Sequence, residues 1–257
     1  MDRETWWDWG WKNQDDPENH PLHPHRSLPE SINGLLEVQP TVIKTSLPRR
    51  PWGSRKALLI GLQSNQEPLE SLVDELVSIE QELKKAHFGV DRIILNESQA
   101  EHELLVKLAS NHWDIIHFSG HFSDREGQFV GLAWDLDVNR FVASCCRAAP
   151  PRLVVMNACS SGQDSKHFES ASGISGTLAE QFCLRGVDAV VATRWGILDD
   201  VALLFSLSFY HSLAAECKNW KKENTIELDI QSCILQSRTE IKKKFPEIDA
   251  ALSLIHI

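Results

Sequence analysis

Short apolar runs alternate with longer amphipathic stretches along most of the chain. A continuous apolar run bounded by Gly, Pro or polar residues is typical of a strand that is buried on both faces, as in a parallel sheet. Five such runs lie at 56–61, 92–95, 113–122, 153–156 and 188–193, and 250–257 reads as a final edge strand. The βαβα alternation predicts a doubly wound, mostly parallel α/β sheet with helices on both faces.

The stretches between the strands carry apolar residues at helical spacing. Helices are expected after Pro68, over Glu101 to Ser110, and in a segment that stops at Gly186, a suitable residue beyond a helix C-terminus. Another helix, capped by Asp199 or Asp200, ends at a polar break over 218–224, and a last helix follows. The buried faces are expected to carry Leu69, Leu72, Val73, Leu76 and Leu83; Ile174, Leu178 and Phe182; Val201, Leu204, Phe205, Phe209 and Leu213; and Ile226, Ile230, Ile234 and Ile241. Between 124 and 149, Gly127, Gly131 and alternating apolar residues predict a small β-hairpin or a plain surface connection.

The first 50 residues differ from the remainder. They contain a short run of four tryptophans and recurrent prolines, without a periodic apolar face. This composition favours an extension or linker, with the tryptophan run as an anchor on a partner or on the domain itself. The expected organisation is therefore an extension over 1–50 and one α/β domain over 51–257.

Candidate chemistry begins at the turn after the 153–156 strand. Small residues follow the strand, and Cys159 stands among them. Open α/β sheets place their chemistry at the carboxyl ends of central strands, although a lone cysteine is also commonly structural. The residues of this turn leave both interpretations open.

A second turn favours the chemical interpretation. The 113–122 strand carries His121 near its carboxyl end. If this strand and the Cys159 strand are adjacent and parallel, their ends lie roughly 5 Å apart. A cysteine and a histidine at that separation can act as nucleophile and base. His117 lies deeper on the same strand and is interpreted as a core histidine.

Three segments together resemble the CHAT domains, which are caspase-like (clan CD) cysteine peptidases related to caspases and separase. They are His-Phe-Ser-Gly-His at 117–121, Leu-Val-Val-Met-Asn-Ala-Cys-Ser-Ser-Gly at 153–162, and Gly-Val-Asp-Ala-Val-Val-Ala-Thr-Arg-Trp-Gly-Ile-Leu-Asp-Asp at 186–200. The resemblance runs from about Arg55 to the C-terminus. It implies a caspase–hemoglobinase-like fold with His121 and Cys159 as the catalytic pair and no third member.

One position departs from the family pattern. The family usually has Gly directly after the catalytic His, and this chain has Phe122. The backbone N–H groups of Gly120, Phe122 and Cys159 are candidates for an oxyanion hole. Two rivals to a peptidase stay open, a non-catalytic (pseudopeptidase) module that binds a peptide in the same groove, and another α/β hydrolase or transferase that uses Cys159.

The composition of the chain limits the classes of partner that it is expected to bind. A net charge of −10 argues against nucleic acid or an anionic membrane as a general partner. No apolar window is long enough to span a membrane, and the acidic, Trp-rich start is unlike a signal peptide. Six scattered cysteines without C-x-x-C spacing favour a reducing cytoplasm, and no metal or cofactor is expected. The expected partners are a protein or peptide substrate and a regulatory protein acting in trans.

The loops expected near the catalytic pair are rich in carboxylates. Asp164 follows Cys159, and Asp199 and Asp200 follow Trp195, which is expected to wall the substrate groove. Clustered carboxylates favour a cationic side chain, so cleavage after Arg or Lys is expected. The alternative is that Asp199 only caps its helix, that the other carboxylates face solvent, and that Trp195 covers the core.

Overall fold

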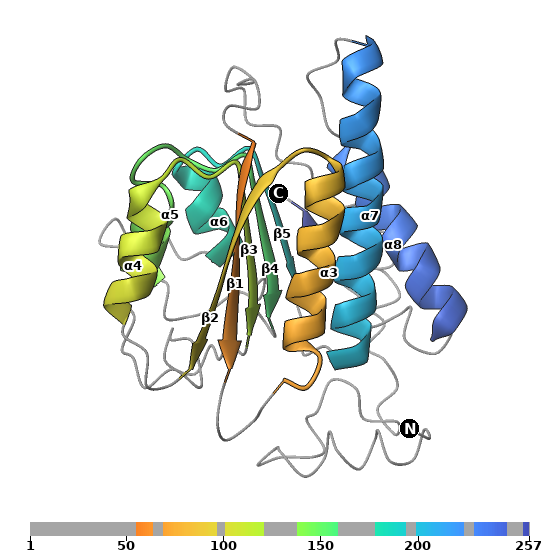
Figure 1. The fold of residues 1–257 in the computed structure, drawn as a ribbon, viewed down its shortest axis with the longest axis horizontal. Coiled ribbons are helices and arrows are strands. Elements are labelled where there is room, and N and C mark those ends of the chain that lie inside the picture. Colours follow the sequence, from red (N-terminus) through yellow and green to blue (C-terminus); the bar gives the residue numbers. More distant parts are fainter. Residues whose placement is uncertain are drawn as a thin grey trace, which may run out of the picture. The chain divides into compact units, whose positions relative to one another are not determined.

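A parallel sheet forms the centre of the molecule, as the apolar runs predict. The computed structural model describes residues 55–63, 69–96, 101–120, 138–158, 178–193, 199–223, 229–245 and 254–256. The strand order is β2-β1-β3-β4-β5-β6; β1 to β5 are mutually parallel, and β6 is antiparallel to β5 (Figure 1). The strands are β1 (Lys56–Gln63), β2 (Gly89–Asn96), β3 (Ile115–Gly120), β4 (Leu153–Ala158), β5 (Ala189–Thr193) and β6 (Leu254–His256).

Helices cover both faces of this sheet. Helices α4, α5 and α6 lie on one face, and α3, α7 and α8 lie on the other (Figure 1). Their bounds are α3 (Leu72–Lys85), α4 (Glu101–Ser110), α5 (Val138–Cys145), α6 (Leu178–Leu184), α7 (Asp199–Glu223) and α8 (Ile230–Lys244). The doubly wound α/β prediction is therefore confirmed. Of the helices that the structure describes, none combines the length and apolar character needed to cross a membrane.

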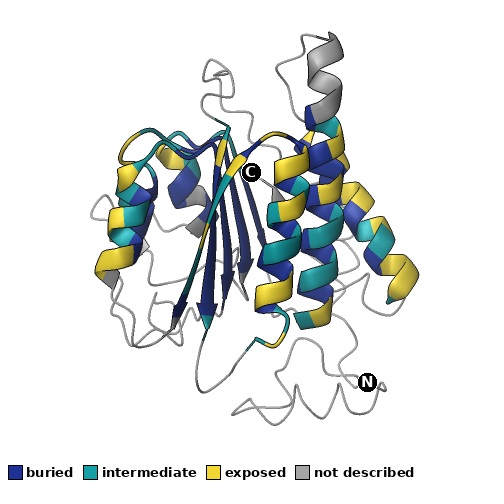
Figure 2. Cartoon of the chain, in the orientation of Figure 1, coloured by how far each residue is buried: buried dark blue, intermediate teal, exposed yellow. Residues whose placement is uncertain are grey.

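The central strands are buried on both sides (Figure 2). Alternate residues of each strand point to opposite faces, so each strand contributes to two separate cores. Leu58, Ile116 and Val154 belong to the core under α4, α5 and α6. Leu59, Ile115 and Val155 belong to the core under α3, α7 and α8. Burial on both faces explains why these strands read as continuous apolar runs.

Most of the predicted helix faces are confirmed where the structure describes them. The α7 stripe is buried, with Phe205, Phe209 and Leu213 at most 1% exposed. Gly186, two residues beyond the end of α6, has φ 86°, a left-handed conformation that glycine adopts without steric cost. Ile174 and Ile226 lie outside the described residues.

Three expectations were wrong. Within the interval 124–149, residues 138–145 form the helix α5 and not hairpin strands, because Phe141, Val142 and Cys145 share one helical face and pack on the sheet; residues 124–137 lie outside the described residues. Helix α7 continues to Glu223 through the expected break, since polarity alone does not end a helix of Lys, Glu and Asn. Val73 is 50% exposed, and the α3 face buries Glu75 and Ile79 instead.

Candidate active site

The two strands that lead to His121 and Cys159 are neighbours in the sheet. Strand β3 pairs with β4 in parallel, and its last residue, Gly120, is the register partner of Ala158. His121 and Cys159 are the next residues in the chain. They lie outside the described residues, as do Phe122, Asp164 and Trp195. The structure thus brings the strand ends that precede the expected pair to adjacent positions.

Gly120 stands at a close approach between β3 and β1. A Cβ atom at this position would lie 2.8 Å from the Cβ of Leu62. Because that neighbour is fixed to its own backbone, a larger residue would force the ends of the two strands apart. Glycine before His121 is therefore required by packing at the carboxyl edge of the sheet.

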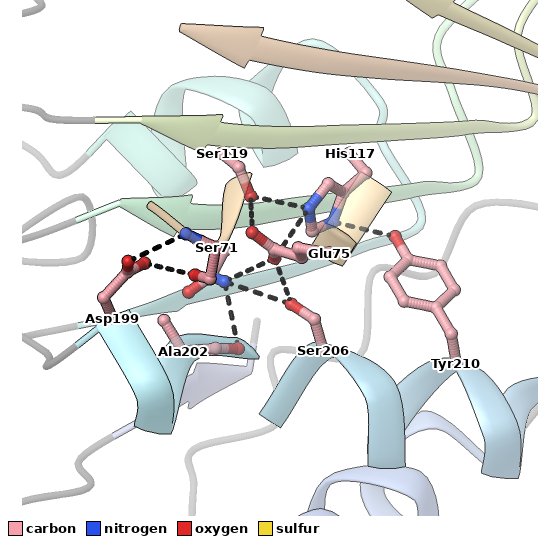
Figure 3. A network of polar contacts seen from close by, with 9 residues as sticks. Ser71, Glu75, His117, Ser119, Asp199, Ala202, Ser206 and Tyr210 are labelled. Carbon is pink, nitrogen blue, oxygen red and sulfur yellow. Dashed lines mark hydrogen bonds and ion pairs between the residues drawn. The ribbon is translucent and has the colours of Figure 1, made fainter. Parts of the chain in front are cut away.

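A buried polar network lies on the α3 and α7 face of the sheet, beside the ends of β3 and β4 (Figure 3). Its centre is the carboxylate of Glu75, a residue of α3 that is 3% exposed. Ser119 Oγ donates to Glu75 Oε2 at 2.8 Å. Asn157 Nδ2 and Ser206 Oγ donate to Oε1 at 2.7 and 2.6 Å. One carboxylate thereby connects α3 to β3, β4 and α7.

His117 completes this network on the side away from the strand ends. Its Nε2 lies 2.9 Å from Ser119 Oγ and 3.3 Å from Glu75 Oε1. Because Ser119 uses its hydrogen for Glu75, Nε2 carries a hydrogen and donates. The other ring nitrogen, Nδ1, lies 3.1 Å from the hydroxyl oxygen of Tyr210. His117 is fully buried, which confirms its interpretation as a core histidine.

The orientation of Asn157 follows from its neighbours. Its Nδ2 donates to Glu75 Oε1, to the carbonyl oxygen of Ala202 at 3.2 Å and to Ser206 Oγ at 3.0 Å. A carboxylate and a carbonyl can only accept, so the amide nitrogen, not the oxygen, must face them. Asn157 Oδ1 is buried and has no hydrogen-bond partner among the described residues.

The network sets the protonation state of its acidic members. Burial by itself raises the pKa of Glu75, but the hydrogen bond and charge attraction of His117, with the hydrogen bonds of Ser206 and Asn157, lower it below the usual 4.5. Burial, together with the negative charge of Glu75, raises the pKa of Tyr210 well above its usual value. At neutral pH the network therefore contains a carboxylate and a phenol.

Of the four expected substrate-binding residues, the structure describes Asp199 and Asp200, both in the first turn of α7. Asp199 Oδ1 accepts from Ser71 Oγ at 2.6 Å, and Oδ2 accepts from the Ser71 N–H at 3.2 Å (Figure 3). Ser71 is the N-cap residue of α3. Asp200 is exposed. The two carboxylates, adjacent in sequence, thus have different surroundings.

Glu75 was not among the expected site residues, although the sequence contains a signal for it. Glu75 follows Leu72 by three residues and precedes Ile79 by four, so it lies within the apolar stripe of α3. A carboxylate on the buried face of a helix needs donors from other elements. Ser119 and Asn157 supply them, but which strands face α3 is decided by the tertiary structure.

Metal binding has no candidate among the described residues. They contain no group of three or more His, Cys, Asp or Glu side chains that could hold a metal ion. The cysteines that the structure describes, which exclude Cys159, form no disulfide.

The fold defines the class of protein. The chain has the fold of the caspase-like cysteine peptidases, with a mostly parallel sheet between two layers of helices. The family model of the CHAT domain matches residues 28–227, more than half of the chain. The chain therefore belongs to the CHAT domain family. The matched range begins within 1–50, so the expected boundary at residue 50 stays a prediction.

Three solved structures with a similar fold are cysteine peptidases of the caspase-like clan. Gingipain R of Porphyromonas gingivalis, an Arg-specific cysteine proteinase, is 12% identical with a TM-score of 0.55 over 79% of this chain and 45% of its own. Separase of Saccharomyces cerevisiae, solved with securin, is 16% identical with a TM-score of 0.51 over 88% of this chain and 13% of its own. The Drosophila initiator caspase Dronc is 11% identical with a TM-score of 0.51 over 86% of this chain and 87% of its own.

This chain thus spans less than half of the gingipain and separase chains. At these identities the similarity establishes the fold. Among curated protein sequences, none matches the chain.

Proposed function

We propose that this chain is a cysteine endopeptidase in which Cys159 is the nucleophile and His121 is the base and acid. The observation that carries the proposal is the register pairing of Gly120 with Ala158, within a chain of the CHAT domain family. Parallel neighbouring strands that end in register lead their next residues to the same edge of the sheet. The expected pair occupies these next two positions.

The reaction follows from the chemistry of the two side chains. His121 takes the proton of the Cys159 thiol, and the thiolate attacks the carbonyl carbon of the scissile peptide bond. The oxyanion that forms is stabilised by backbone N–H groups, for which Gly120, Phe122 and Cys159 are the candidates. The C–N bond then breaks, His121 gives its proton to the leaving amine, and water hydrolyses the thioester. No step requires a metal or a cofactor.

The proposed specificity is for a basic residue before the scissile bond. It rests on sequence positions: Asp164 follows β4, and Trp195, Asp199 and Asp200 follow β5. Asp200 is exposed and can meet a cationic side chain. Asp199 already accepts two hydrogen bonds from Ser71, so its contribution to a pocket is through its charge at a distance. We therefore rank Asp200 above Asp199 as a specificity residue.

Regulation by a partner protein is a further part of the proposal. The separase structure contains securin, and a gingipain structure contains a pro-domain. For this chain we propose a partner that acts in trans, with the Trp-rich segment as its contact. The reducing cytoplasm is the proposed compartment, because a thiolate nucleophile is preserved there.

The test is cleavage of an unbiased peptide library by the wild-type chain and by three variants. Cys159→Ala and His121→Ala are each expected to abolish turnover, because removing one member of a coupled pair loses most of the rate. Cys183→Ala is the matched control, because it removes a different thiol, which lies on α6. This variant should retain activity. Normal turnover by Cys159→Ala would refute the assignment. A wild-type chain that binds peptides without cleaving them, with and without candidate partners, would indicate a pseudopeptidase.

Specificity is tested with fluorogenic peptides that differ only in the residue before the scissile bond. Arg and Lys peptides should be hydrolysed faster than Leu and Asp peptides. Asp200→Asn should reduce the preference for Arg over Leu. An Asp peptide that is hydrolysed fastest would contradict the acidic pocket, and an unchanged preference in Asp200→Asn would exclude that residue from it.

A further inference from the structure

Ser119 and Asn157 occupy equivalent positions on their two strands. They are register partners on β3 and β4, and each precedes a residue of the expected catalytic pair by two positions. Side chains two positions apart on a strand share one face of the sheet. The side chains of Ser119 and Asn157 therefore share the face of the sheet that α3 and α7 cover, two positions in sequence before His121 and Cys159.

Both residues donate to the same carboxylate. Ser119 Oγ reaches Glu75 Oε2, and Asn157 Nδ2 reaches Glu75 Oε1. A hydrogen bond restrains distance and angle, whereas an apolar contact tolerates small shifts of either partner. Glu75 consequently holds the ends of β3 and β4 at a defined position relative to α3.

We propose that Glu75 is a positioning residue for His121 and Cys159, acting through Ser119 and Asn157; this inference rests on the proposed function. The carboxylate fixes the two strand ends from which the catalytic turns begin. It also connects them to α7 through Ser206, whose Oγ donates to Oε1. A shift of α3 or α7 would thus reach both catalytic turns through one side chain.

The energetic cost of the arrangement supports a role beyond packing. A charged carboxylate in a core is costly unless donors replace its hydration, and apolar residues of similar volume often stabilise such sites equally well. Glu75 is surrounded by four donors, from Ser119, Asn157, Ser206 and His117. The four donors come from β3, β4 and α7, and Leu72, Leu76 and Ile79 supply the apolar packing of the same helix.

Asn157 depends on this carboxylate for its orientation. Every hydrogen bond that the structure gives to its side chain is made by Nδ2, to acceptors on α3 and α7. With Oδ1 unpaired among the described residues, no bond from the sheet itself holds the amide. Removal of the Glu75 charge would therefore leave Asn157 Nδ2 with acceptors on α7 alone and would break its bond to α3.

The test compares Glu75→Gln with Ile79→Ala. The glutamine keeps the shape and one accepting oxygen, but its amide nitrogen faces donors and cannot accept from them. Ile79 lies one turn further along α3, is fully buried, and has an apolar side chain that makes no hydrogen bond to the network. Its truncation should lower stability and leave the hydrogen bonds to the strand ends in place. Both variants are measured at a temperature where circular dichroism shows them folded.

Two readouts are used. Glu75→Gln should lower kcat on the best peptide about 10- to 100-fold with KM changed by less than about threefold, since small misplacement of reacting groups costs rates of this size. The second readout is the pH profile of Cys159 alkylation by iodoacetamide, resolved from the other cysteines by peptide mass mapping. Glu75→Gln should displace this profile, and Ile79→Ala should leave kcat and profile as in the wild type.

The outcomes separate this inference from the proposed function. If the wild-type chain cleaves peptides and Glu75→Gln matches Ile79→Ala in both readouts, Glu75 is only structural and the inference is overturned. If the wild type cleaves nothing, the proposed function fails, and the alkylation profile alone decides whether Glu75 positions Cys159. Should Glu75→Gln fail to fold, Ser119→Ala removes a single donor. An unchanged kcat and profile in that variant would overturn the inference, and a loss of kcat with a displaced profile would support it.

Discussion

The carboxylate of Asp199 accepts two hydrogen bonds from Ser71, 128 positions earlier in the chain. In a capping box, a glutamate of the first helical turn bonds the backbone N–H of its own N-cap residue. Here the acceptor for the N-cap residue of α3 comes from the first turn of α7. The beginnings of two helices on the same face of the sheet are thereby fixed to each other.

Asp199→Ala should lower the free energy of unfolding by about 0.5–2 kcal/mol, the usual cost of losing a helix cap. Asp200→Ala is the matched control, because both residues lie in the first turn of α7 and only Asp199 bonds to Ser71. The exposed Asp200 should change stability by less than about 0.5 kcal/mol. Urea denaturation measures both. Equal losses would mean that the Ser71 bonds contribute nothing beyond the charge at the helix terminus.

Gly120→Ala should lower the free energy of unfolding by about 1–3 kcal/mol, as overpacking does, because its Cβ would lie 2.8 Å from Leu62 Cβ. Peptidase activity should fall with it, since the displaced strand end leads to His121. Gly89→Ala is the control on an outer strand, where the nearest atom, the carbonyl oxygen of Arg55, is 3.9 Å away. A Gly120→Ala chain as stable as Gly89→Ala would contradict the close approach of β1 and β3.

Stability should decrease in acid through Glu75. The folded-state pKa of Glu75 is lowered from 4.5, so near that pH the unfolded chain binds more protons than the folded one, and stability rises with pH. The contribution of Glu75 is complete above about pH 4.5 and is lost as pH falls through the lower, folded-state pKa. Glu75→Gln should flatten this part of the profile, measured by urea denaturation at several pH values.

Glu82 contributes in the same pH window. Burial raises the pKa of the Glu82 carboxyl, but Lys85 and His211 together lower it by more than burial raises it. The net pKa of Glu82 is therefore below 4.5. Because this contribution is present in both proteins, the difference between wild type and Glu75→Gln isolates Glu75. A difference that does not change between pH 3 and pH 6 would contradict the lowered pKa.

Alkylation at neutral pH should leave three cysteines unmodified in the folded chain. Burial raises the pKa of the Cys217 thiol to about 11 and, with nearby negative charge, that of Cys233 to about 12. Burial also raises the pKa of Cys145 well above its usual value. Because the thiolate is the reacting species, these residues should react only after denaturation. Mass mapping of native and denatured samples checks this, and native modification of Cys217 would contradict its burial.

Much of the fold could be predicted because its signals are local. Buried strands produce continuous apolar runs, and helices such as α4 and α7 produce the 3.6-residue spacing wherever one face packs on a sheet. The interval that became α5 was misread, since Phe141, Val142 and Cys145 are too few to separate a short helix from alternating strand residues. The polar residues after Lys218 were misread because polarity marks solvent exposure and does not mark a helix end.

The sequence by itself determined the α/β class, the strands that lead to His121 and Cys159, and the family to which the chain belongs. These follow from periodicity and motifs, which depend on residues close together in the chain. Only the tertiary structure decided that Glu75 lies opposite Ser119 and Asn157, and that Asp199 bonds to Ser71. Each of these contacts joins elements distant in sequence, and the choice among possible polar partners depends on how α3 and α7 pack on the sheet.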